Sequence, residues 1–182
     1  MAADLTVPEA WSAPMRWVEI SSGKARFTLA APPEALPRVA RSLGLEHLSS
    51  LEADLVIRPW FDGVEIQGEV RALCTRLCGI SLAPFEERVD DEMRLRIVPP
   101  ASDHAPDLAL AEVVIDLDAE DPPDVLAGDV VDLGAYLVEH LALALDPFPR
   151  APGAVFQPEA IDPADTSPFA RLRGLGLKAP DA

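Results

Sequence analysis

Two cysteines, Cys74 and Cys78, are the residues of this chain whose type and spacing best suit chemistry. They stand in "CTRLCG", with three residues between them. Zinc binds thiolates that lie close together, so the pair could form half of a zinc site. Two ligands do not complete a tetrahedron, however, and His47, His104 and His140 are isolated in the sequence. Buried or simply reduced cysteines are the favoured interpretation, and a redox or metal role is the weaker alternative.

An acidic run between Asp116 and Asp124 could in principle bind calcium. A calcium loop of the EF-hand type that begins at Asp116 needs glycine at its sixth position and glutamate at its twelfth. This chain has Asp121 and Ala127 there. A solvated acidic loop is therefore the favoured interpretation, and metal-dependent RNA cleavage by its carboxylates is the enzymatic alternative.

The sequence contains no recognisable catalytic motif. A nucleophile elbow, a Walker loop and a dinucleotide fingerprint are all missing. Glu139 and His140 are neighbours on an expected helix, so their side chains do not face each other. We therefore expect no catalytic residues, no cofactor and no resident metal.

Composition and charge favour a globular protein with basic partners. The 182 residues are 49% hydrophobic, and 31 acidic residues against 15 basic ones give a net charge of −16. Such a field repels nucleic acid and anionic membranes and attracts basic proteins. The N-terminus lacks the pattern of a signal peptide, and no apolar run is long enough to span a bilayer. The cytoplasm is the expected compartment, and the oligomeric state stays open.

The elements that must position these residues begin with a hairpin in "LEADLVIRPWFDGVEIQGEVRALC". Asp62-Gly63 is the expected two-residue turn, and counting back from it pairs Leu55 with Val70 on an apolar face. On the other face of the hairpin, the residues expected opposite each other are polar and compatible. A long strand is expected over Phe85–Val98, and shorter strands over residues 16–20, 25–30 and 111–118.

Two helices complete the expected fold. The first follows Pro32-Pro33 and stops at Gly44, and the second runs from an Asp132 cap to about Leu145. The sequence therefore predicts an α+β fold, with an antiparallel sheet, a central hairpin and two main helices. We expect residues 1–150 to form one domain, and residues 151–182 to form a flexible tail that ends in a short docking helix or a frayed terminus.

Three stretches resemble the YceD-like family of large ribosomal RNA subunit accumulation proteins. They are "CGISLAPFEERVDDEMRLRIVP", "VVDLGAYLVEHLALALDPFPRAPGA" and "SPFARLRGLGLK". The chain looks like an alphaproteobacterial-type member, with Cys78 as the cysteine that leads the first stretch and Asp146 to Arg150 as an Asp-Pro-aromatic-Pro-Arg run. Other branches carry a tight Cys-x-x-Cys, whereas here three residues separate the two cysteines.

The resemblance implies a non-enzymatic factor needed for 23S ribosomal RNA to accumulate and for the large ribosomal subunit to assemble. The net charge favours a basic ribosomal protein or a preribosomal large subunit as the first partner, with indirect contact to ribosomal RNA. The alternative is direct RNA binding through local basic residues, namely Arg71, Arg94, Arg96, Arg171, Arg173 and Lys178.

Two sets of residues are the expected partner-binding sites. Asp146, Phe148 and Arg150 follow the second helix, where prolines on both sides limit the backbone freedom of Phe148 and so lower the entropy cost of binding. An anchoring role for Phe148 and simple packing under the tail are equally compatible with the sequence. The second set lies in the terminal peptide and consists of Phe169, Arg171 and Leu172.

Overall fold

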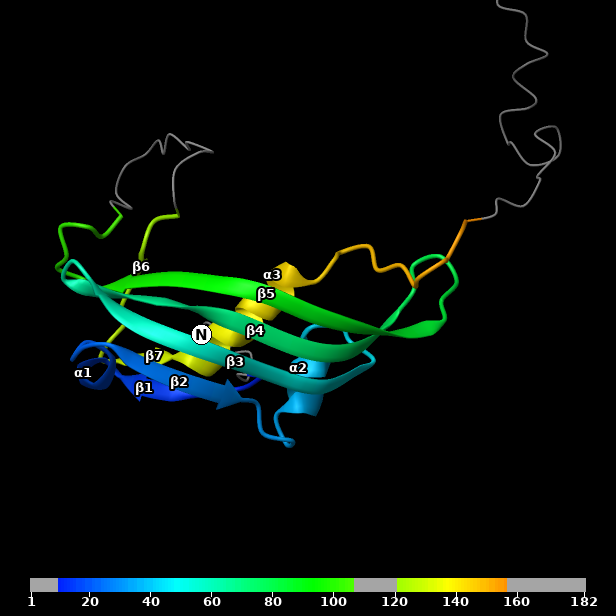
Figure 1. Cartoon of the computed structure of the whole chain (residues 1–182), viewed down its shortest axis with the longest axis horizontal. Helices are drawn as coiled ribbons and strands as arrows, with labels where there is room; N and C mark the ends of the chain where they lie inside the picture. The colour runs from blue at the N-terminus through cyan, green and yellow to red at the C-terminus, as the bar shows by residue number, and fades with distance from the viewer. Residues whose placement is uncertain (1–9, 107–120, 157–182) are drawn as a thin grey trace, which may run out of the picture.

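The computed structural model describes residues 10–106 and 121–156, which form an α+β fold (Figure 1). Five strands form a mixed sheet in the order β2-β3-β4-β5-β6, and β1 pairs with β7 in a separate two-stranded sheet. The strands are β1 (Pro14–Arg16), β2 (Ala25–Ala30), β3 (His47–Trp60), β4 (Gly63–Leu77), β5 (Pro84–Val98), β6 (Asp124–Val125) and β7 (Val130–Asp132). The helices are α1 (Trp17–Ile20), α2 (Leu36–Ser42) and α3 (Leu133–Ala144).

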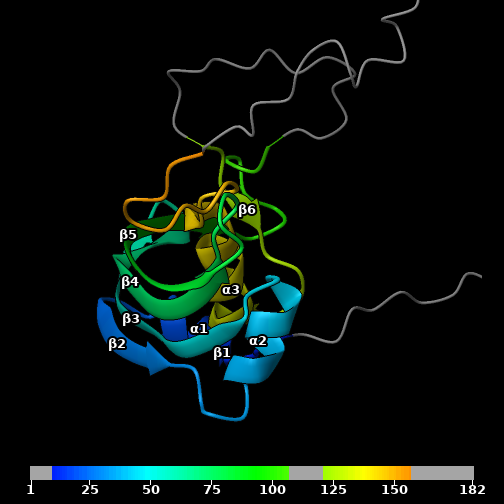
Figure 2. The same cartoon turned by 90° about the vertical axis from the view of Figure 1, so that its right-hand side faces the viewer.

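The large sheet curves around α3, which lies on its concave side together with α2 (Figure 2). Alternate residues of β3 and β4 point to this side and are buried there. Leu133, Leu137 and Leu141 of α3 pack against them with no exposed surface. This side of the helix therefore closes the core. Buried residues from Trp11 to Leu141 form one continuous cluster.

The β3–β4 hairpin turns one residue earlier than the sequence predicts. The two strands pair Trp60 with Gly63, so Phe61 and Asp62 form the two-residue turn. The prediction that Asp62-Gly63 is the turn is therefore wrong. Glycine is needed inside the strand at position 63, because a side chain there would overlap the backbone carbonyl of Ile97 on β5.

The predicted register of the hairpin is wrong by two residues. Leu55 lies opposite Gly68 instead of Val70, and Val70 lies opposite Ala53. A shift of two residues leaves every side chain on its original face, because side chains alternate along a strand. Leu55 and Val70 are buried as expected. The core face was thus predicted correctly, although the partners across it were not.

Residues 16–20 do not form the predicted strand. They contain α1, in which the N–H of Ser21 donates to the carbonyl of Trp17 at 2.9 Å. The N–H of Trp17 donates to the carbonyl of Asp129 at 2.7 Å. The helical turn buries Ile20 completely. The strand at residues 25–30 is confirmed as β2.

Both main helices form where the sequence predicts them. Pro37 occupies the first turn of α2, where no intrahelical partner is lost, and Gly44 follows the helix with a φ of 66°. At α3, the side chain of Asp132 accepts a hydrogen bond from the N–H of Ala135 at 3.1 Å. The long strand predicted over Phe85–Val98 is confirmed as β5.

Asp132 also fixes the N-terminal segment to the start of α3. Its carboxylate accepts hydrogen bonds from the Ser12 hydroxyl at 2.5 Å and the Ala13 N–H at 2.7 Å. Burial of Asp132 favours the neutral acid, but these hydrogen bonds outweigh it and hold the pKa of the carboxyl below its ordinary value.

Several predictions fall on residues that the structure does not describe. The strand at 111–118, most of the acidic run and the terminal peptide with Phe169, Arg171 and Leu172 lie outside the described residues. Of the predicted tail, only residues 151–156 are described, and they contain neither helix nor strand.

Candidate functional site

Two segments far apart in the sequence meet at one end of the large sheet. They are the β4–β5 turn (residues 78–83) and the segment that leaves α3 (residues 146–156), which lie together at the right of Figure 1. The N–H of Gly79 donates to the carbonyl of Pro149 at 2.8 Å, and Nη2 of Arg76 donates to the carbonyl of Asp146 at 2.6 Å. We call the surface formed by these two segments the exit surface.

Arg76 is held in place for this contact by a second partner. Its Nη1 lies 2.8 Å from Oε2 of Glu87 on β5, and the Arg76 side chain is only 11% exposed. An ion pair with so little exposure is screened less than a surface pair. The position of Asp146 is therefore tied to the two strands that flank the turn.

The segment after α3 is stiff and presents an aromatic ring. The side chain of Asp146 accepts a hydrogen bond from the N–H of Phe148 at 2.8 Å, which closes a local turn. The prolines at positions 147 and 149 fix the backbone on both sides. Phe148 is 74% exposed, so its ring does not pack against the described residues. The choice between an anchoring role and packing under the tail stays open, because residues 157–182 of the tail lie outside the described residues.

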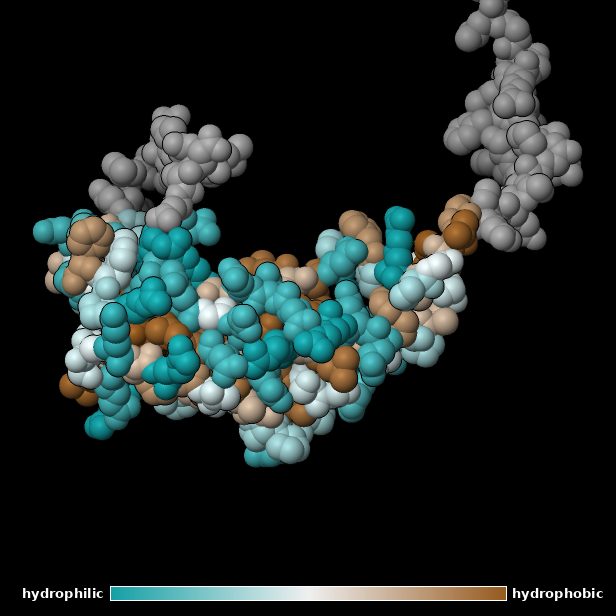
Figure 3. Space-filling view, viewed as in Figure 1, coloured by the Kyte–Doolittle hydropathy of each residue, from teal (hydrophilic) through white to brown (hydrophobic). Residues whose placement is uncertain are grey.

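Further apolar side chains are exposed on the same surface. Leu82 in the turn is 74% exposed and has a φ of 57°, and Val155 and Phe156 are exposed on the exit segment. Figure 3 shows hydrophobic residues where the described part of this segment ends. Exposed apolar residues that gather in one region, beside charged ones, are typical of a protein-binding surface.

The sulfur of Cys78 joins the two halves of the exit surface. Sγ accepts hydrogen bonds from the N–H groups of Ile80 at 3.4 Å and Ser81 at 3.5 Å. The Ser81 side chain contributes most to lowering the pKa of the thiol to about 6, with further help from backbone N–H groups that include that of Ala151. The sulfur is buried, and a pKa of about 6 favours the thiolate over the thiol at neutral pH.

Cys74 and Cys78 are not joined and do not share this chemistry. Both are reduced and buried. Burial raises the pKa of the Cys74 thiol, whose Sγ donates to the carbonyl of Glu87 at 3.6 Å. Within residues 10–106 and 121–156, no group of three or more His, Cys, Asp or Glu side chains could hold a metal ion.

This difference predicts a single low-pH thiol titration. The thiolate absorbance of the folded protein should rise around pH 6 in the native chain and in Cys74→Ser, because Cys78 is responsible. Cys78→Ser should lack this step and titrate only at higher pH. An unchanged step in Cys78→Ser would contradict the assignment.

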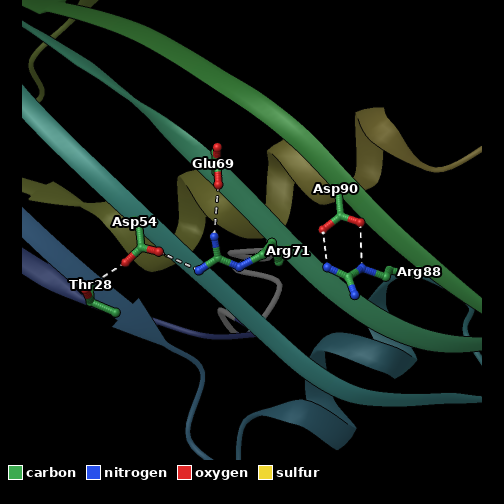
Figure 4. A network of polar contacts seen from close by, with 6 residues as sticks. All are labelled: Thr28, Asp54, Glu69, Arg71, Arg88 and Asp90. Atoms are coloured by element: carbon green, nitrogen blue, oxygen red, sulfur yellow. Dashed lines mark hydrogen bonds and ion pairs between the residues drawn. The ribbon is translucent and has the colours of Figure 1, made fainter.

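Several arginines of the sheet are paired with carboxylates. On the outer face, Arg71 donates to Asp54 at 2.5 Å and to Glu69 at 3.2 Å, as Figure 4 shows. Arg94 and Arg96 both contact Oε1 of Glu65, at 2.9 Å and 3.1 Å. Three of the basic residues considered for RNA binding are thus neutralised locally.

The structure brings together only part of the predicted site. Asp146, Phe148 and Arg150 lie on the exit surface, and Arg150 is exposed. Nε2 of His140 lies 3.1 Å from Oδ2 of Asp91 on β5. Among the described residues, no contact of His140 with another histidine or with a cysteine is found. The roles of Arg76 and Gly79 were not predicted, because nothing local in the sequence indicates that the turn and the exit segment touch.

Comparisons with known proteins give no relative: no family model, no curated protein and no solved structure matches this chain. In the described part of the chain, none of the helices has the length and apolar character needed to cross a membrane.

Proposed function

We propose that this chain is a non-enzymatic cytoplasmic factor that supports 23S ribosomal RNA accumulation and large-subunit assembly. It acts by binding a basic ribosomal protein or a preribosomal large subunit through the exit surface, and its contact with ribosomal RNA is indirect. One observation carries the proposal. The two internal stretches that resemble the YceD-like family meet in space, where the N–H of Gly79 donates a hydrogen bond to the carbonyl of Pro149.

The chemistry of the exit surface suits a basic protein partner. Phe148 supplies a large apolar contact whose backbone is already restricted, so little entropy is lost on binding. The net charge of −16 raises the rate at which a basic partner arrives. Aromatic side chains at the centre of a contact are frequent hot spots.

Direct RNA binding is the less favoured alternative. A phosphate contact gains affinity when a cation replaces the counterions of the nucleic acid. To contact phosphates, the sheet arginines would first have to break their ion pairs with carboxylates, or bring these negative charges close to the phosphates. The pairs are those of Arg71 with Asp54 and Glu69, and of Arg94 and Arg96 with Glu65.

The test is capture from lysate on the purified protein, with and without nuclease, at low and moderate salt. Bound proteins and RNA are then identified. We expect a basic large-subunit protein to stay bound after nuclease treatment. Loss of all bound material together with the RNA would overturn the proposal in favour of direct RNA binding.

Phe148→Ala should weaken this capture by about tenfold or more, because a central aromatic anchor is lost while the fold is unaffected. Val18→Ala is the matched control: Val18 is 65% exposed on α1, at the other end of the molecule in Figure 1. It should leave capture unchanged. Equal capture by both variants would show that the exit surface is not the contact.

A further inference from the structure

Three aromatic rings gather at the end of the sheet opposite the exit surface, around the β3–β4 turn (left in Figure 1). Phe61 and His104 are stacked, with ring centroids 4.0 Å apart and an interplanar angle of 24°. Trp60 meets the edge of Phe61 at 4.8 Å and lies 5.6 Å from His104. The three rings, which we call the aromatic cluster, are not part of the core.

The loop that carries His104 is fixed against the turn. The Ser102 hydroxyl donates to Oδ1 of Asp62 at 2.8 Å, and Oγ of Ser102 accepts from the N–H of His104 at 3.0 Å. Ser102 is buried, and its N–H donates to the carbonyl of Pro99 at 3.0 Å. The stack of Phe61 and His104 is therefore preformed rather than a chance contact of two surface side chains.

Phe61 is an unfavourable residue for its position. Its φ of 49° lies in the left-handed region, which costs a bulky side chain energy that glycine or asparagine would avoid. Its ring is also 71% exposed, so little burial offsets the strain. A strained and exposed aromatic residue, held by a fixed loop, points to a role outside the fold.

The cluster already binds one guanidinium group. The Cζ atom of Arg96 lies 5.0 Å from the centroid of the Trp60 ring, and its charge is met by Glu65 at 3.1 Å. An aromatic face with a nearby carboxylate is thus an arginine site that this protein uses internally. At the Phe61 stack, Asp62 and Asp103 are the acidic neighbours in the chain, and Asp103 is exposed.

We propose that the stack of Phe61 and His104 is a docking site for an arginine side chain in a basic segment of a partner protein. The guanidinium plane lies on the exposed ring, and its charge is met by Asp62 and Asp103. Nucleobases also stack on aromatic rings, but the phosphates attached to them are repelled by a chain of net charge −16. This site goes beyond the proposed function, because it is a second surface. The proposal for it does not depend on what the exit surface binds.

The experiment titrates the full chain with an arginine-rich peptide, a lysine-rich peptide of equal length and charge, and a single-stranded RNA oligonucleotide. The ring resonances of Phe61 and His104 are followed by NMR. The arginine peptide should shift both rings and bind several-fold more tightly than the lysine peptide, because a planar guanidinium stacks and an ammonium does not. Stronger ring shifts with RNA, equal binding of both peptides, or no ring shifts would each overturn the proposal.

Phe61→Asn and Asp103→Asn separate the ring from the charge. Asparagine tolerates the left-handed backbone, so Phe61→Asn should keep the fold and lose the preference for arginine over lysine. Asp103→Asn should weaken both peptides by about two- to fivefold. Phe148→Ala should bind the arginine peptide like the native chain. A loss of peptide binding in Phe148→Ala together with unchanged binding in Phe61→Asn would assign the peptide to the exit surface instead.

Discussion

Leu137→Ala is expected to lower the free energy of unfolding by about 2–5 kcal/mol. Leu137 lies in the middle of α3 with no exposed surface and belongs to the cluster that joins the helix to the large sheet. Removing its branched end loses apolar burial and leaves a cavity that the rigid strands cannot fill. Urea unfolding followed by circular dichroism measures the change.

Leu143→Ala is the matched control on the same helix. Leu143 is 79% exposed, so the same deletion of atoms removes little buried surface. We expect a change within about 0.5 kcal/mol, because alanine is also the best helix former. Equal destabilisation by the two variants would mean that the leucine side of α3 does not close the core.

The hairpin illustrates what a sequence pattern can and cannot predict. Alternation along residues 51–74 identified the buried face correctly, because a side chain points to the core or to solvent whatever its partner is. The turn was misplaced because Asp-Gly is a strong local turn signal. Gly63 is instead required by the approach of Ile97, which is 34 positions away and invisible to local rules.

The exit surface was predicted only in part for the same reason. The stiffness of the backbone around Phe148 follows from its flanking prolines, whereas the exposure of its ring, 74%, was left open by the sequence. The contact of Gly79 with Pro149 joins residues 70 positions apart, and it depends on how β4 and α3 end relative to each other. The residues at the end of β4 contain no pattern that predicts a contact with the end of α3, and the reverse is also true. The aromatic cluster was missed because Phe61 was expected to lie in a strand rather than in the turn.

Gly68→Ala should destabilise the protein by about 3 kcal/mol or more. Gly68 lies in the middle of β4, opposite Leu55 on β3 and Met93 on β5. A methyl group there would overlap the backbone carbonyl oxygen of Asp54, and it would lie only 2.8 Å from the carbonyl carbon of Asp54 and 2.9 Å from Cα of Leu55. These are backbone atoms of a paired strand, so the clash is relieved only by moving β3 away from β4 and weakening the centre of the sheet.

Gly79→Ala is the control that separates this clash from the general effect of replacing glycine. The methyl group would lie 3.4 Å from the carbonyl oxygen of Pro149, which is ordinary contact, and the backbone of Gly79 does not have a positive φ. We expect stability within about 0.5 kcal/mol of the native chain or slightly above it, because alanine restricts the unfolded state. Both variants are compared by urea unfolding. Equal stability of Gly68→Ala and Gly79→Ala would mean that β3 and β4 do not approach each other at Gly68 as closely as the structure has them. The register that places Leu55 opposite Gly68 would then be wrong as well.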